Sequence, residues 1–217
     1  MLAEHRPRSY GTRMRRVLLA LLLAVSIAAA DDGWRRIDVE DGIVIETRDV
    51  EGSALREVRA TTHTDVDPPA IAAVLWRHEE HPRFVPHLLH VEVVRDAGDE
   101  RIVYEQISVP LLRDRDVVLR ARRQVDPSSG VIDVRTTAIT DEGPPETSRF
   151  VRVRESAGHW HLVPASAGGT DVTYTIRTDV GGTLPAWIVN RAQHETVPDL
   201  VRAMLARAHA TSGTAPH

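Results

Sequence analysis

Tyr104, Arg115 and Asp116 are the side chains most able to supply acid, base or charge chemistry in this chain. Arg115 and Asp116 are adjacent at the start of a segment with strand character. A charged pair there could orient a hydroxyl group of a bound molecule. The alternative, which we favour, is a structural salt bridge, because buried charges are usually held by one another. Glu105, next to Tyr104, is a further potential general acid or base.

Four histidines lie close together in the sequence: His78, His81, His87 and His90. His78 and His81 stand three residues apart, whereas the two histidines of a zinc-peptidase helix stand four apart. Two intervening prolines would also break a helix that had to align all four. We therefore expect no metal site and no cofactor, and we interpret these histidines as solvated residues at a helix end and in a loop.

His159 and His161 flank Trp160 in a second segment with strand character. Successive side chains of a strand point to opposite faces. If Trp160 points into the core, both histidines are expected to point to solvent.

The sequence lacks the motifs of several other kinds of functional site. The chain has no Ser-His-Asp order, no phosphate-binding glycine loop and no nucleotide fingerprint. It has no cysteine, and hence neither a disulfide nor a thiol nucleophile. Its formal net charge of −4 argues against nucleic acid as a partner.

The last part of the predicted fold is a strand, a double glycine and a long helix, and these elements help to position the residues named above. Residues 171–179 alternate apolar and polar side chains, as expected of a strand with one buried face. Gly181 and Gly182 permit a sharp turn, and Thr183 is the predicted N-cap of a helix to about His209. Pro198 is expected to kink this helix.

The preceding chain predicts an antiparallel sheet interrupted by one helical insertion over 68–84, broken near His81-Pro82. A sheet covered by one long helix is an α+β architecture. Strands are expected over 34–40, 43–50, 55–64, 88–96, 101–109, 116–125, 131–139, 149–155, 160–164 and 172–178.

Several motifs follow one another in a familiar order: Trp34 with residues 41–43, Val109-Pro110 with residues 115–118, residues 150–152 with 158–160, and residues 179–190. Residues 34 to about 207 resemble a START domain, the lipid-binding branch of the helix-grip, Bet v 1-like superfamily. The resemblance implies a curved antiparallel sheet around a long C-terminal helix, with a hydrophobic tunnel between them. Cholesterol-binding members carry an arginine where this chain has Ala121, which argues against cholesterol-type recognition.

Residues that would line such a tunnel come from both sides. The apolar stripe of the last helix includes Leu200 and Met204, and few large side chains oppose it, which favours a cavity. The predicted ligand-binding residues are Tyr104, Arg115, Asp116, Trp160, Tyr174, Trp187, Leu200 and Met204.

The first thirty residues predict a secretory signal peptide. Val17–Ala30 is apolar apart from one serine, arginines precede it, and three alanines close it. A membrane-spanning helix would need ~20 apolar residues, so an uncleaved anchor is the second alternative. We expect cleavage near Ala30-Asp31, a START-like domain over 31–210 and a disordered tail over 211–217.

The sequence thus predicts a periplasmic or secreted monomer that binds one hydrophobic small molecule, without covalent chemistry. Lipid transfer or sensing, with transient membrane contact, would follow. One alternative is an enzyme similar to polyketide cyclases or dehydratases, with acid and base groups aimed into the pocket. Another is a ligand-free module that binds a protein partner.

Overall fold

The computed structural model describes residues 32–110 and 112–213. The predicted signal peptide, its cleavage site and the last four residues of the predicted tail lie outside the described residues. The described residues from Gly33 to Gly213 form one compact unit. Within the described part, none of the helices combines the length and apolar character that a membrane span requires.

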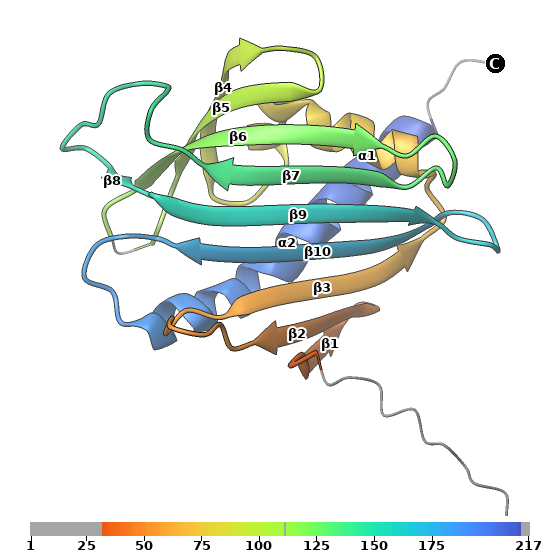
Figure 1. Cartoon of the computed structure of the whole chain (residues 1–217), viewed down its shortest axis with the longest axis horizontal. Helices are drawn as coiled ribbons and strands as arrows, with labels where there is room; N and C mark the ends of the chain where they lie inside the picture. The colour runs from red at the N-terminus through yellow and green to blue at the C-terminus, as the bar shows by residue number, and fades with distance from the viewer. Residues whose placement is uncertain (1–31, 111, 214–217) are drawn as a thin grey trace, which may run out of the picture. The chain divides into compact units, whose positions relative to one another are not determined.

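One sheet contains all ten strands of the described residues, in the order β1-β2-β3-β10-β9-β7-β6-β5-β4 (Figure 1). Neighbours along this path are antiparallel, whereas the short β8 pairs in parallel with β6. The strands are β1 (Arg35–Glu40), β2 (Ile43–Arg48), β3 (Glu57–Thr64), β4 (Leu88–Asp96), β5 (Glu100–Ile107), β6 (Arg115–Val125), β7 (Ile132–Ala138), β8 (Val151–Arg152), β9 (Glu155–Pro164) and β10 (Thr170–Asp179).

Two α-helices, α1 (Pro68–Trp76) and α2 (Ala186–Ser212), cover the same face of this sheet (Figure 1). The 3-10 helix η1 (His78–Arg83) follows α1. The α+β helix-grip architecture is confirmed. Most of the core lies between sheet and helices, because alternate strand residues such as Ile45, Val172 and Tyr174 are buried on that face. A smaller cluster on the opposite face contains Ile102, Tyr104, Val118 and Ile139.

Helix α2 differs from its predicted bounds at both ends. It begins at Ala186 with Pro185 as N-cap, rather than after Thr183, because a proline disfavours helical backbone at the residue before it. It ends at Ser212, two residues inside the predicted tail. The hydroxyls of Thr211 and Ser212 donate to the carbonyl of Ala208 at 3.0 and 2.9 Å, so both side chains fold back onto the last turn of the helix.

The strand pattern also has two corrections. The predicted strand over 149–155 is divided, because Val151–Arg152 form β8 and Glu155 already belongs to β9, which starts there instead of at Trp160. Trp160 does point into the core, and His159 and His161 point to the other face, as predicted.

The prediction that His78 and His81 are solvated was wrong, because both side chains are buried. His78 Nδ1 lies 3.1 Å from the carbonyl oxygen of Trp76, and His81 Nε2 lies 3.0 Å from that of Val74. Both carbonyls lie at the end of α1. Val74 also accepts the N–H of Arg77, and Trp76 also accepts from the Arg101 guanidinium, so each imidazole shares its acceptor with another donor. Burial lowers the pKa of both, that of His78 to about 3. His87 is exposed, as predicted.

Candidate functional site

Helix α2 presents one side to the sheet, with buried residues at intervals of three and four positions. Met204 belongs to the core, and Leu200 is partly buried against it. Both therefore lie on the side of the helix where they were predicted. The buried stripe of α2 contains Val189, Asn190, Gln193, Val197, Pro198, Val201, Met204, Leu205 and Ala208.

Trp160 and Tyr174 form the aromatic part of the opposing surface. They are cross-strand partners on β9 and β10, and their rings stack with centroids 4.3 Å apart. Because each belongs to the core-facing set of its strand, both side chains point toward the helices. The structure brings these two predicted residues together.

Glu105 is a carboxyl group on the same inner face, one residue from the predicted Tyr104. Among the described residues it forms no hydrogen bond or ion pair, and burial raises its pKa to about 7. Protein surrounds the carboxyl, yet the side chain keeps part of its accessible surface. This combination is expected of a group that faces internal space. Burial also raises the pKa of the Tyr174 phenol, and the charge of Glu105 adds to that shift.

Arg115 shares the inner face with Val117 and Ala121 of β6. Its side chain is buried, and its guanidinium donates to the carbonyl of Val180 at 3.3 Å and to that of Arg113. Val180 belongs to the connection between β10 and α2. Arg115 thus ties this connection to the start of β6.

The predicted ion pair between Arg115 and Asp116 does not exist in the structure. Neighbouring residues of a strand point to opposite faces, so these two side chains diverge. Asp116 instead pairs with Arg152 at 2.8 Å, and both side chains are buried. The Tyr104 hydroxyl donates to the same carboxylate at 3.2 Å. Tyr104 and Asp116 therefore form a network on the face that α2 does not cover.

Trp187 lies in the first turn of α2 and is 68% exposed. Its indole is at the surface, apart from the buried stripe of the helix. Leu112, between β5 and β6, is also exposed. A polar hollow of about 430 Å³ is lined by Arg113, by β8 and the residues around it, and by Gly181 and Gly182 of the connection between β10 and α2. The tunnel between sheet and helix stays a prediction.

Sequence reasoning named Glu105 as a potential acid or base but did not include it among the ligand-binding residues. It gave Gln193 no role in the site. The Oε1 atom of Gln193 is buried without a hydrogen-bond partner, while its amide nitrogen donates to the carbonyl of Thr178 at 3.2 Å. The alternation of β5 could have placed Glu105 on the inner face, since Val103 and Glu105 share one side of that strand.

Comparison with known proteins agrees with this architecture. The family model described as START domain matches residues 20–212. An uncharacterized protein of Pseudomonas aeruginosa is 27% identical over 175 residues, which covers 80% of this chain and 86% of that protein. Human phosphatidylcholine transfer protein is 24% identical over 184 residues, which covers 82% of this chain and 84% of that protein.

A solved structure gives the same result in three dimensions. The crystal structure of a STAR-related lipid transfer protein from Xanthomonas axonopodis matches with a TM-score of 0.76 and 29% identity, and the match covers 82% of this chain and 99% of that one. The resemblance inferred from the sequence is confirmed. Since the family model spans most of its length, the chain belongs to the START domain family.

Proposed function

We propose that this protein binds one lipid-like molecule between the sheet and α2 and carries or senses it in the cell envelope. The observation that carries this proposal is the pair of unpartnered polar groups on the inner surface. The Glu105 carboxyl and Gln193 Oε1 have no protein hydrogen-bond partner among the described residues. Buried polar atoms usually have a partner, and a polar group of a ligand would supply one here.

The surroundings of these groups indicate the class of ligand. Trp160, Tyr174 and Met204 offer mainly apolar surface, which favours an acyl chain or a sterol- or hopanoid-like body. A carboxyl with a pKa of about 7 can donate or accept a hydrogen bond near neutral pH. We therefore infer an amphipathic ligand with a largely apolar body and a small polar group such as a hydroxyl.

Loading and release would take place where the molecule touches a membrane. Trp187 and Leu112 are exposed apolar side chains. Arg113, next to Leu112, and Gly181 and Gly182, in the connection that leads to α2, line the same hollow. Tryptophan is favoured at the boundary between lipid headgroups and acyl chains. The chain is acidic overall, so we propose a transient contact through these apolar residues rather than through positive charge.

The proposed setting is the periplasm or the extracellular space, where the protein would act as a monomer. Its support is the apolar segment 17–30 with arginines before it and alanines at its end. Intact-mass measurement of protein from the native envelope fraction tests this. A mature N-terminus at or near Asp31 is expected, and a full-length cytoplasmic species would contradict export.

An enzyme on the same fold is the second candidate function. It would need acid and base groups directed into the interior. Of the three groups that the sequence offered, Tyr104 and Asp116 lie on the opposite face, which leaves Glu105. The named relatives are lipid transfer proteins, so we place lipid carriage first.

Native mass spectrometry of protein purified from the envelope, followed by lipid extraction, tests the carrier function. A lipid at one copy per protein is expected, and the protein should move that lipid from donor to acceptor vesicles. If no lipid co-purifies and a panel of fluorescent fatty acids and sterols does not bind, lipid carriage is wrong. Conversion of an added polyketide substrate would then favour the enzyme.

A further inference from the structure

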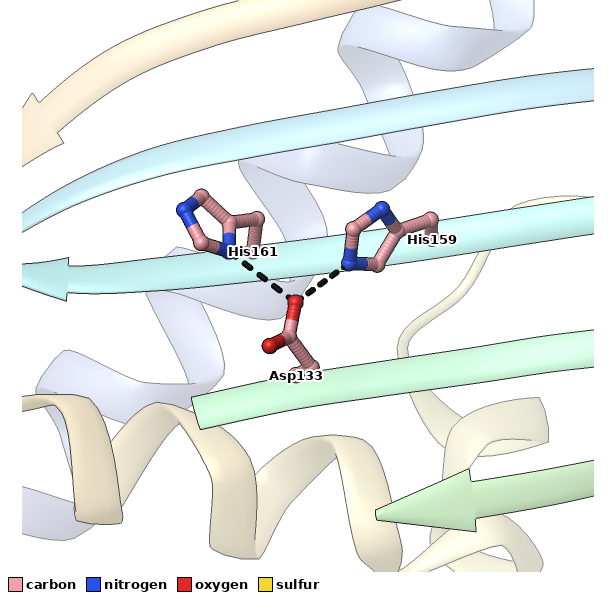
Figure 2. Close-up of side chains that lie close together, drawn as sticks. All are labelled: Asp133, His159 and His161. Carbon is pink, nitrogen blue, oxygen red and sulfur yellow. Dashed lines mark hydrogen bonds and ion pairs between the residues drawn. The ribbon is translucent and has the colours of Figure 1, made fainter. Parts of the chain in front are cut away.

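Three side chains with metal-binding atoms meet on the outer face of the sheet, away from α2. His159 and His161 alternate with Trp160 on β9 and therefore share that face. Asp133 of β7 is the cross-strand partner of His161, so its carboxylate lies beside both rings. Figure 2 shows the two imidazoles converging on this one carboxylate.

The distances are close to those of a metal site. Asp133 Oδ1 lies 2.5 Å from His159 Nε2 and 2.9 Å from His161 Nδ1. The three potential ligand atoms all lie within 4.8 Å of one another. In a tetrahedral zinc site with bonds near 2.0–2.1 Å, ligand atoms are separated by about 3.3 Å. A small retreat of the Asp133 carboxylate would therefore make room for the ion.

A single carboxylate oxygen carries all the polar contacts in this cluster. Besides the two imidazoles, Arg135 approaches the same Oδ1 at 3.3 Å. The Arg135 side chain is 51% exposed, so it can turn into solvent when a cation arrives. The Asp133 side chain is only 19% exposed, which holds the carboxylate between the histidines.

We propose that Asp133, His159 and His161 bind a divalent transition-metal ion of the zinc class. Two imidazoles and one carboxylate form a ligand set that suits zinc, copper, nickel or iron, rather than calcium or magnesium. Three protein ligands leave at least one coordination position open. That position faces a groove of about 550 Å³, which the three residues line together with Arg48, Arg59 and Thr175.

The same face provides a matched control. His63 and Asp171 lie on β3 and β10, and their polar atoms are 2.9 Å apart. This pair consists of one histidine and one carboxylate. Among the described residues, no second histidine joins it to form a group of three potential ligands. If exposed histidine–aspartate pairs alone took up zinc, His63→Ala would weaken binding as much as His159→Ala.

The test is isothermal titration calorimetry with Zn²⁺ on the tag-free mature protein. The variants His159→Ala, His161→Ala and His63→Ala are titrated in the same way. We expect one zinc per wild-type chain, with affinity unchanged by excess Mg²⁺. Removing a residue that only orients a metal ligand weakens metal affinity by roughly 10- to 100-fold. Loss of either His159 or His161, which would bind the ion directly, should weaken zinc affinity by at least as much. His63→Ala should bind as wild type does, and circular dichroism should show all four proteins folded.

Visible absorption of the Co²⁺-loaded protein gives a second readout. Ligand-field bands of a four- or five-coordinate site are expected in the wild type and in His63→Ala, and not in His159→Ala. Absence of stoichiometric Zn²⁺ binding by the wild type would overturn the proposal. Equal losses in His63→Ala and His159→Ala, or a folded His159→Ala variant with wild-type affinity, would also overturn it.

Discussion

The carboxylate of Asp116 and the guanidinium of Arg152 form a two-point ion pair, with Nε–Oδ1 and Nη2–Oδ2 distances of 3.0 and 2.8 Å. The two side chains are only 2% and 5% exposed. Arg152 also donates to the carbonyl of Pro144, so the pair fastens the long segment before β8 to the outer face of β6.

Removal of one member should therefore cost much more than removal of both. Asp116→Ala leaves Arg152 buried without its counter-charge, and we expect a loss of about 3–5 kcal/mol in the free energy of unfolding. Replacing both residues with apolar ones of similar size should cost less. Urea denaturation measures both. The exposed pair of Arg191 and Glu195 is the control, and Glu195→Ala should change stability by less than about 0.5 kcal/mol.

Burial of His78 should make stability depend on pH. Its pKa is lowered from 6.5 to about 3, so between these values the unfolded chain binds a proton that the folded chain does not. The contribution of His78 to the free energy of unfolding is fully present above pH 6.5. It is lost as the pH falls toward 3, by at most about 1.4 kcal/mol per pH unit. His78→Gln should weaken the acid-induced loss, whereas the exposed His90→Gln should leave it unchanged.

Glu105 should act in the opposite direction. Its pKa is raised from 4.5 to about 7, so between these values the folded chain keeps a proton that the unfolded chain has released. This contribution falls as the pH rises from 4.5 to 7, again by at most about 1.4 kcal/mol per pH unit. Between pH 4.5 and 6.5 the two effects oppose each other. Denaturation across this window should show a steeper rise of stability with pH in Glu105→Gln than in wild type; an unchanged slope would contradict an interior carboxyl.

Glycine should be required at position 158 for stability, because the Thr136 side chain occupies the space that a β-carbon would need. A β-carbon at Gly158 would lie 2.6 Å from Thr136 Oγ1, well inside van der Waals contact. We expect Gly158→Ala to destabilise the protein by about 1–3 kcal/mol through overpacking. Adding Thr136→Ala removes the clashing oxygen and should recover part of the loss. Additive losses in this double-mutant cycle would mean that the two sites do not interact.

The part of the fold that rests on local periodicity could be predicted from the sequence. Alternation along β9 and β10 placed Trp160 and Tyr174 inward, and the double glycine marked the turn before α2. The pairing of Asp116 with Arg152 could not be predicted. It spans 36 positions and depends on a two-residue parallel strand, and nothing local distinguishes Arg152 from Arg149 or Arg154.

Two errors had a physical cause that the sequence did contain. The expected pair of Arg115 and Asp116 ignored the pleat, which sends adjacent residues to opposite faces. His78 was predicted to be solvated because helix ends usually lie at the surface. The last carbonyls of a helix nevertheless need hydrogen-bond donors, and a buried imidazole can supply one. The meeting of Asp133 with His159 and His161 required the register of β7 against β9, and alternation alone does not give a register.

The interior itself can be tested by filling it from the helix side. Leu200 is partly buried against the core, and Met204 is buried within it. Ala206 lies on the same helix but is exposed, so tryptophan there adds the same bulk outside the interior. Leu200→Trp, Met204→Trp and Ala206→Trp thus form a matched set.

We expect Leu200→Trp to weaken binding of a fluorescent fatty acid by tenfold or more, about 1.4 kcal/mol, because the indole would occupy space that the acyl chain needs. Met204→Trp should act in the same direction, with some loss of stability because it overpacks a filled position. Ala206→Trp should bind as wild type does. Thermal melts accompany the titrations, so that a misfolded variant is recognised before its affinity is compared. Wild-type affinity in a folded Leu200→Trp variant would show that the ligand does not lie beneath this part of α2, and equal weakening in Ala206→Trp would assign the effect to the helix surface instead.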